Sequence, residues 1–435
     1  MALTSRQKKI VFVTILIAIG VIFLGIKFYR KKPTPITLEI WGISDDSNIF
    51  SPIINSFQKE YPYIHINYTK KDEANYHEDI LTAFSDNQNP DIFMLWGSNL
   101  PYYENKISYL DLTNDKDLTL FDLDRAYPQI VKDRLLNDNY LFGIPLYVDT
   151  LALYYNQDIF NNYNIALPPA TWEEILNLIP NLRRINAQGQ ITRAAIALGS
   201  PYNVQWDFDI ISALMMQYGS NIVDVNKKQT TLKYDLLVNG KRIIPSEEAL
   251  NFYTQFSNPY SNNYTWNDNF VDSVITFSKG DTVMLIGYNQ AQNIIEEYNP
   301  NLNYGIASLP QFTNSLSKIN YGDTMSLVVS QNSKYSQESW EFLKFLAQED
   351  ASEFYYLQTK NPPARLDLIQ NYINDPDSGI FIRQILTSQN WYQYNFKEIN
   401  QIFIEMIEAI AHKGKTFIEA IVTANDKINF FWNKK

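Results

Sequence analysis

The stretch PLYVDTLALYYNQDIF, residues 145–160, joins a proline, a lone acidic residue, a dense apolar run and a polar end. Leu151 to Tyr155 is too short for a stable helix and too apolar for a loop, so it predicts a buried strand. Pro145 bounds that strand on one side, and the polar residues 156–158 bound it on the other. Asp149 is therefore expected at the mouth of a strand.

Strands and helices alternate upstream of this stretch. ITLEIW (36–41) has the alternation of a strand, and structure is expected to begin there. Ser51 to Tyr61 predicts a helix, with Pro52 in its first turn and apolar residues at helical spacing. IHINY (64–68) returns as a strand. This order of strand, helix and strand is typical of an α/β fold.

The same alternation continues along the chain. A helix is expected around Tyr76 to Asp86, and TWEEIL opens another with a capping box from Thr171 to Glu174. A further helix is expected at 336–349. Further strands are expected at 91–96, 283–286 and 326–330. No repeat of fixed short period and no long low-complexity segment interrupts the pattern, so we predict an α/β protein with two lobes.

Length and composition agree with two domains. The chain has 435 residues, which is too long for one ordinary domain. Hydrophobic residues make up 45% of it, enough to form a large core. It has no cysteine, which excludes disulfides, thiolate zinc sites and cysteine nucleophiles. Its three histidines, His65, His77 and His412, lack the spacing of metal ligands. We therefore predict neither a metal site nor a cofactor.

Residues 10–26, IVFVTILIAIGVIFLGI, are uncharged and predict a membrane segment, at the short end of the roughly 17 to 25 residues that span a bilayer. No small-residue cleavage pattern follows, so an uncleaved anchor over residues 1–32 is favoured over a cleaved signal peptide. Basic residues on both sides leave its orientation open. They are Arg6, Lys8 and Lys9 before the segment and Lys27, Arg30, Lys31 and Lys32 after it.

The remainder of the chain is strongly acidic and rich in aromatic residues. Residues 33–435 carry 29 basic and 47 acidic residues, a net charge of −18, which disfavours nucleic acid as a partner. The chain has 30 Tyr, 25 Phe and 8 Trp. Aromatic rings offer rigid apolar faces with a polar edge, which suit the faces of sugar rings, although most of these side chains are expected in the core or on the surface.

Eight segments in a fixed order resemble the extracellular solute-binding proteins of bacterial ABC importers, in the sugar-binding group that includes maltose-binding protein. The resemblance runs from about residue 36 to about residue 367, and its strength lies in the order of the segments. They are ITLEIW (36–41), FQKEYPYIHINY (57–68), NPDIFMLWG (89–97), LFGIPLYVDTLALYYNQDIF (141–160), LPPATWEEIL (167–176), FSKGDTVMLIGY (277–288), YGIASLP (304–310) and SKYSQESWEFLKFLAQEDASEFYYLQTKNPPAR (333–365).

This resemblance implies a periplasmic-binding-protein fold of the second type, in which two α/β lobes close on a ligand by hinge motion. The expected division is an anchor over 1–32, a linker over 33–35, a first lobe over 36–147 and 308–352, and a second lobe over 148–307 and 353–435. The family's usual lipid-anchoring cysteine is missing, and the predicted membrane helix would replace it, with the binding domain on the extracellular face.

The resemblance also implies a role for the opening stretch. It would cross from the first lobe to the second, and Asp149 would face the cleft and accept hydrogen bonds from sugar hydroxyls. The alternative is that Asp149 caps a turn. Tyr147 would line the cleft or the hinge.

Most of the other cleft candidates lie in or beside the ends of predicted strands, where ligands usually bind. Trp206 and Trp391 are candidates because the resemblance implies stacking aromatics in that part of the second lobe. For each tryptophan among them, core packing is the alternative, and the polar GSN after Trp96 favours a site there. Arg365 is expected in a structural ion pair. The candidates are Trp41, Asp45, Trp96, Ser98, Asn99, Trp206, Tyr288, Tyr321, Asp323 and Trp391.

We predict that the protein captures a carbohydrate, specifically an oligosaccharide, and delivers it to an ABC permease. It is expected to act as a monomer and to carry out no covalent chemistry. Two other classes stay open. A glycoside hydrolase also combines carboxylates with cleft aromatics, but the sequence singles out no carboxylate pair. A sensor or an adhesin could use the same fold with a different partner.

Overall fold

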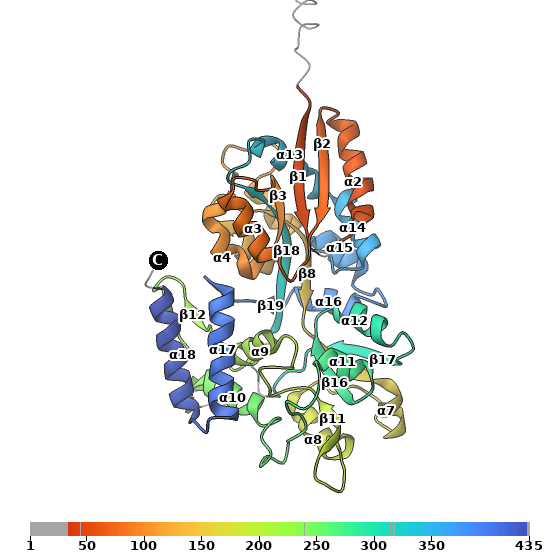
Figure 1. The fold of residues 1–435 in the computed structure, drawn as a ribbon, viewed down its shortest axis with the longest axis vertical. Coiled ribbons are helices and arrows are strands. Elements are labelled where there is room, and N and C mark those ends of the chain that lie inside the picture. Colours follow the sequence, from red (N-terminus) through yellow and green to blue (C-terminus); the bar gives the residue numbers. More distant parts are fainter. Residues whose placement is uncertain (1–33, 44, 239, 314, 316–317, 433–435) are drawn as a thin grey trace, which may run out of the picture.

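The protein consists of two α/β lobes, one above the other in Figure 1. The computed structural model describes residues 34–43, 45–238, 240–313, 315 and 318–432. Each lobe is built on its own main sheet. The two-lobe α/β part of the predicted fold class is thus present in the described residues.

The sheet of the first lobe is mixed, with three parallel strands at one edge and an antiparallel strand beside them. β1 (Ile36–Gly42) pairs in parallel with β2 (Ile64–Lys70) and with β3 (Ile92–Trp96). β18 (Asn320–Ser330), from far along the chain, joins β3 in antiparallel register. The sheet order is β19-β18-β3-β1-β2, with β19 at Ser388–Gln389.

The helices and short strands attached to this sheet come from both halves of the chain. From the first half these are α2 (Ser47–Glu60), α3 (Tyr76–Ser85), α4 (Leu100–Tyr103), β4 (Ile107–Ser108), β5 (Leu110–Asp111), α5 (Leu120–Ala126), α6 (Gln129–Leu135), β6 (Leu136–Asn137) and β7 (Tyr140–Leu141). From the second half these are α13 (Ser336–Leu346), α14 (Glu349–Thr359), α15 (Leu366–Tyr372) and α16 (Gly379–Ile385).

The second lobe has a five-stranded sheet in the order β10-β11-β16-β9-β17. Its strands are β9 (Ala152–Asn156), β10 (Arg184–Ile185), β11 (Ile191–Ile196), β16 (Thr282–Gly287) and β17 (Tyr304–Ser308). Its helices are α7 (Gln157–Asn162), α8 (Trp172–Leu182), α9 (Asp207–Gln217), α10 (Pro245–Thr254), α11 (Ser273–Ser278), α12 (Ala291–Tyr298), α17 (Phe396–Ala411) and α18 (Phe417–Trp432). Two hairpins lie beside them, β12 (Val223–Asp224) with β13 (Gln229–Thr230) and β14 (Leu236–Val238) with β15 (Lys241–Ile243).

The opening stretch forms two strands that belong to different sheets. β8 (Ile144–Thr150) pairs with β18 in the first sheet, and β9 lies in the second. Leu151 is the residue between them, and its backbone N–H donates to the carbonyl of Tyr321 (2.9 Å). Asn156 ends the run by capping α7, because its side chain accepts from the backbone of Ile159. The predicted crossing between lobes is therefore made by β8 and β9 together.

Two separate apolar cores support the lobes. One contains Val148 and Met325, and the other contains Leu151 and Tyr321. β8 and β18 thus each pass from one core to the other within a few residues, and both lie at the waist of the molecule (Figure 1). These paired antiparallel strands connect the two lobes.

The boundaries predicted for the lobes remain a proposal, and packing favours one change to them. Tyr355 and Tyr356 of α14 and Ile369 of α15 lie in the core with β1 to β3. Phe403 of α17 and Ile421 of α18 lie in the other core. We therefore propose that the second lobe resumes after α16 and not at residue 353.

The predicted membrane anchor must be corrected. Within the ranges that the structure describes, no helix is long and apolar enough to cross a membrane. The longest helices there, α17 and α18, have 16 residues each, fewer than the roughly 20 that a bilayer requires. The predicted segment, residues 10–26, lies outside the described residues. The transmembrane helix in the predicted fold class is therefore not supported, and neither is the predicted location on a single-pass membrane anchor.

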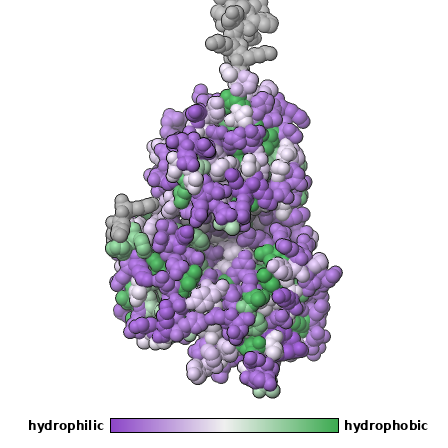
Figure 2. Space-filling view, in the orientation of Figure 1, coloured by the Kyte–Doolittle hydropathy of each residue, from purple (hydrophilic) through white to green (hydrophobic). Residues whose placement is uncertain are grey.

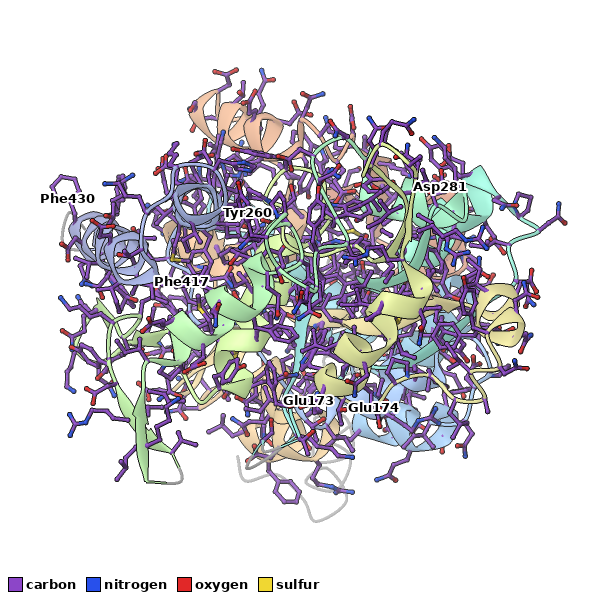
Figure 3. The ribbon with its side chains drawn as sticks, turned by 90° about the horizontal axis from the view of Figure 1, so that it is seen from below. Glu173, Glu174, Tyr260, Asp281, Phe417 and Phe430 are labelled. Atoms are coloured by element: carbon purple, nitrogen blue, oxygen red, sulfur yellow. The ribbon has the colours of Figure 1, made fainter. Side chains whose placement is uncertain are left out.

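Most of the predicted helices and strands are confirmed, including the capping box of Thr171 and Glu174 at α8. Figure 3 shows Glu173 and Glu174 together at the start of that helix. Two boundaries were wrong. β18 begins at Asn320 and not at residue 326, so Tyr321 and Asp323 lie inside the strand. α2 begins at Ser47, so Pro52 lies inside the helix and not in its first turn. Arg365 forms the expected ion pair, with Asp367.

Candidate functional site: the cleft between the lobes

The carboxyl ends of the parallel strands point toward the junction of the two lobes. β1, β2 and β3 run down toward it in Figure 1, and β11 and β16 are the parallel pair of the second lobe. In open α/β sheets, ligands bind in the crevice outside these ends. Figure 2 shows the face of the molecule hollowed between the lobes. The loops after these strands are therefore the candidate site.

The end of β1 and the loop that follows it carry two predicted residues. Trp41 is partly exposed, and the Lys71 ammonium lies 3.8 Å from the centre of its ring. Asp45 is buried, and one of its carboxylate oxygens accepts from the hydroxyl of Tyr355 (2.6 Å). Trp41 is therefore available to a ligand on part of its surface, whereas the carboxylate of Asp45 already has a protein partner.

A chain of aromatic rings links this loop to the hinge. Trp96, at the end of β3, is partly exposed and packs edge-on against Tyr147 of β8, with ring centres 5.8 Å apart. Tyr147 in turn lies parallel to Tyr355 at 6.4 Å. The structure thus brings together Trp96 and Tyr147, two separately predicted residues, and Tyr355, which the sequence analysis missed, connects them to Asp45.

The two predicted carboxylates of the hinge lie opposite each other. Asp149 of β8 and Asp323 of β18 are register partners. Asp149 accepts from the backbone N–H of Asn289 (2.9 Å), just before α12 in the second lobe. Asp323 accepts from the backbone N–H of Ser98 (3.0 Å) in the first lobe. Each aspartate therefore fastens one of the crossing strands to one lobe.

These contacts agree with the alternative interpretation of Asp149, that it caps a turn, and its role in ligand binding stays a prediction. It is 1% exposed, and a second backbone amide, that of Thr150, also donates to it. Burial raises the pKa of Asp149 to about 7, although hydrogen bonds from backbone amides lower it. Burial likewise raises the pKa of Asp323, which the nearby Arg134 and the groups of Ser98 lower.

The wall of the second lobe contains Trp206 and Tyr288. Trp206 precedes α9 in a left-handed backbone conformation, with φ of 63°, and is partly exposed. Its ring packs edge-on against Tyr288, with ring centres 5.6 Å apart. Gly287 leaves room for it, because a Cβ there would lie 2.8 Å from Cζ3 of Trp206. A bulky residue with positive φ in a loop is a typical sign of a functional loop.

Asp209 is a site residue that the sequence analysis missed. Burial raises its pKa to about 7, the charge of Asp323 adds to this rise, and hydrogen bonding to Tyr288 and Tyr321 lowers the pKa. Three predicted residues thus surround it. Its position in the first turn of α9, three residues after Trp206, is the sequence signal that could have identified it.

Tyr202 was also missed. It follows β11, its side chain is 55% exposed, and its ring stacks on the imidazole of His412 at 5.8 Å. The imidazole in turn lies 3.3 Å from Asp268. The stretch SPYNVQW, a polar loop after an apolar strand, could have singled out this tyrosine together with Trp206.

The other predicted residues occupy different positions. Ser98 and Asn99 form the turn after β3, where Asn99 is partly exposed. Tyr321 is fully buried and donates to Asn390 (2.9 Å). Trp391 is 4% exposed and its indole N–H donates to Ser212 of α9 (3.1 Å). Trp391 therefore belongs to the core of the second lobe.

Comparison with known proteins identifies the family. Residues 43–353 match the sequence model of the bacterial extracellular solute-binding proteins. The chain belongs to this family. The resemblance predicted from the eight segments is thereby confirmed at the level of the family.

Individual relatives are distant. A binding protein of Brucella abortus is 29% identical over 254 residues, which are 56% of this chain and 56% of that protein. The chain thus spans only about half the length of that relative. The galactooligosaccharide-binding protein of Bacillus subtilis is 24% identical over 344 residues, 78% of this chain and 74% of the relative.

The fold agrees with solved structures. A sugar-binding protein of Xanthomonas citri superimposes with a TM-score of 0.73 over 92% of this chain and 98% of that protein, at 20% identity. At this identity the likeness concerns the fold. The two-lobe fold described above is therefore shared with that protein.

Proposed function

We propose that the chain is the substrate-binding component of an ABC importer, and that it captures a carbohydrate, an oligosaccharide, between its lobes. The observation that carries the proposal is the set of partly exposed tryptophans on both lobes, Trp41 and Trp96 near the ends of β1 and β3 on one and Trp206 at the start of α9 on the other. Such rings suit the apolar faces of sugars. The names of relatives in Bacillus subtilis and Xanthomonas citri, which are sugar-binding proteins, support the same ligand class.

The proposed mechanism is hinge closure about β8 and β18. A sugar would contact aromatic rings of both lobes, so it binds the closed form more tightly and shifts the population toward it. Closure would bring Trp206 and Tyr202 toward Trp41 and Trp96. Polar groups at the strand ends, such as Asn99, would pair with the hydroxyls. A membrane permease would then receive the sugar from the closed form.

The first test is a thermal-shift screen of residues 33–435 against oligosaccharides, monosaccharides, sugar phosphates, peptides and polyamines. A ligand at about 100 times its Kd stabilises the protein by about 2.7 kcal/mol, which raises the melting temperature measurably. We expect a saturable shift with one class of oligosaccharide. A shift with peptides or polyamines alone would refute the ligand class.

Variants locate the site. Trp96→Ala and Trp206→Ala are each expected to weaken sugar binding about threefold to tenfold, because an aromatic stacking contact is lost. Tyr260→Ala is the matched control, since Tyr260 is 97% exposed and lies on the surface of the second lobe (Figure 3). Equal affinity of all three variants and the unmodified protein would place the ligand elsewhere.

Delivery to a permease is a separate part of the proposal. A bacterium that lacks this protein should lose uptake of the labelled sugar identified in the screen. In a separate assay, the purified protein should leave that sugar chemically unchanged. Sustained release of shorter sugars by the purified protein would instead show a glycoside hydrolase. Normal uptake without the protein would favour a sensor or an adhesin.

A further inference from the structure

A cavity of about 470 Å³ lies between the lobes and continues the candidate cleft. Gly97, which directly follows Trp96, lines this cavity from the first lobe, and Trp391 lines it from the second. Two further residues of its wall, Asn137 and Phe142, belong to or directly follow the strands of a small separate sheet on the first lobe. That sheet therefore adjoins the space in which a ligand is proposed to bind.

The small sheet presents several aromatic residues on one face. Its three strands lie in the order β5-β7-β6, and Tyr140 of β7 is the antiparallel register partner of Asn137 in β6. Residues directly opposite each other in such a pair point to the same face. Phe142, two residues after Tyr140, shares this face because side chains alternate along an extended chain. Tyr109 joins them, since its ring centre lies 6.3 Å from that of Phe142.

The two faces of this sheet differ in character. Leu110, Leu136 and Leu141 point to the other face and pack in or against the core of the first lobe. On the aromatic face, the side chains of Tyr109 and Tyr140 are 55% and 41% exposed, and their ring centres are 4.6 Å apart. We call this face the tyrosine platform. It consists of Tyr109, Asn137, Tyr140 and Phe142.

We propose that the tyrosine platform is a carbohydrate subsite for the part of a long oligosaccharide that extends out of the cleft; this inference rests on the proposed function. Aromatic rings with exposed faces suit the apolar faces of sugar rings. Phe142 is 8% exposed and connects the platform to the cavity. A sugar chain that leaves the cavity past Phe142 therefore meets the rings of Tyr140 and Tyr109 next.

The polar groups beside the platform favour a neutral sugar chain. Asn137 is exposed, and its amide offers both donors and an acceptor to hydroxyl groups. Among the described residues that line the cavity, Glu104 and Asp133 are acidic and Arg134 is basic. Carboxylates accept charge-assisted hydrogen bonds from hydroxyls. Two carboxylates against one guanidinium disfavour an anionic oligosaccharide at this wall.

The platform belongs to the first lobe alone, which gives it a particular effect on binding. A contact with one lobe is the same in the open and the closed form, so it adds affinity without shifting the population between them. A short sugar that ends inside the cleft does not reach the platform. The platform should therefore make the protein prefer long oligosaccharides over short ones of the same series.

Titration calorimetry with linear maltooligosaccharides, galactooligosaccharides and mannooligosaccharides, each from disaccharide to heptasaccharide, tests this preference. We expect the heptasaccharide of one series to bind about threefold to tenfold more tightly than its trisaccharide. The double variant Tyr109→Ala with Tyr140→Ala should lose this advantage and keep the affinity for the trisaccharide. Tyr298→Ala is the matched control, because Tyr298 is 53% exposed but lies on α12 of the second lobe.

Hydroxyl-radical footprinting read by mass spectrometry locates the contact in the unmodified protein, so its result does not depend on how the variants fold. The heptasaccharide should protect Tyr109 and Tyr140 from oxidation, and the trisaccharide should not. Affinities that do not depend on length, or equal oxidation of both tyrosines with and without the heptasaccharide, would overturn the platform and leave the proposed cleft intact.

Two further outcomes separate the platform from the proposed function. If none of these sugars binds, the proposed function fails and the platform fails with it. If the double variant binds every sugar as the unmodified protein does, but cells that carry it lose uptake, the exposed tyrosines contact a permease and the carbohydrate subsite is refuted.

Discussion

At the residue scale, Trp206 shows how a glycine and a strained backbone together place an aromatic ring. Its φ of 63° is a conformation that costs of the order of 1–3 kcal/mol for a bulky residue. Its ring occupies the space above Gly287, where a Cβ would also lie 3.4 Å from Cβ of Ala291. The absence of a side chain at residue 287 is therefore a condition for the position of Trp206.

Gly287→Ala is expected to displace the Trp206 ring, to destabilise the protein by about 1–3 kcal/mol and to weaken sugar binding, because the added methyl group overlaps the indole. Urea denaturation and tryptophan fluorescence measure these effects. Combined with Trp206→Ala, the same substitution should cost much less, since the clash is gone. Additive costs in this double-mutant cycle would show that the two residues do not interact.

Asp207 predicts an unusual dependence on pH. One of its carboxylate oxygens is buried without a hydrogen-bond partner, and burial raises its pKa to about 7. The folded state therefore keeps a proton that the unfolded state releases near pH 4. The stability that this group contributes is complete below about pH 4 and is lost as the pH rises to about 7.

Asp207→Asn should remove this contribution. The melting temperature of the variant, relative to that of the unmodified protein, is expected to rise between pH 5 and pH 8. Asp86→Asn, at an exposed position, is the control and should leave the difference flat. A difference for Asp207→Asn that is also flat would mean that this carboxyl is ionised across the whole range.

At the element scale, the start of α8 isolates one local interaction. Thr171 accepts from the backbone N–H of Glu174, and the Glu174 side chain accepts in return from the backbone N–H of Thr171. Thr171→Ala should destabilise the protein by about 0.5–2 kcal/mol, because the backbone N–H of Glu174 loses the hydroxyl that accepts its hydrogen bond. Urea unfolding checks this value. Thr423→Ala, at an exposed position inside α18, should change it little, and equal effects would exclude capping as the cause.

Elements with a clear local pattern were predictable from the sequence, since the alternation of β1 and the capping box of α8 are decided within a few residues. The junction of β8 and β9 was not, because one apolar run carries no sign of where it leaves one sheet for another. The site residues that lie near strand ends, such as Trp41 and Trp96, were predictable from the sequence. The side-chain partners were not, since Asp209 meets Asp323 only through the path of β18, more than a hundred residues away.

At the scale of the whole molecule, the two cores have a consequence for unfolding. Leu285 of β16 is fully buried in the core of the second lobe and has no place in the other core. The lobes are joined by β8, β18 and the segment around β19, so their apolar interiors do not form one unit. A cavity in one interior should therefore weaken that lobe first.

Leu285→Ala is expected to cost about 2–5 kcal/mol, as for a buried leucine in a packed core. Hydrogen exchange followed by mass spectrometry should show faster exchange in β9, β11 and α8, with β1 and β2 still protected. Leu237→Ala is the matched control, because that leucine is 75% exposed. Faster exchange in both lobes together would mean that the strands β8 and β18 couple the lobes into a single cooperative unit. Any hinge motion would then have to strain both lobes.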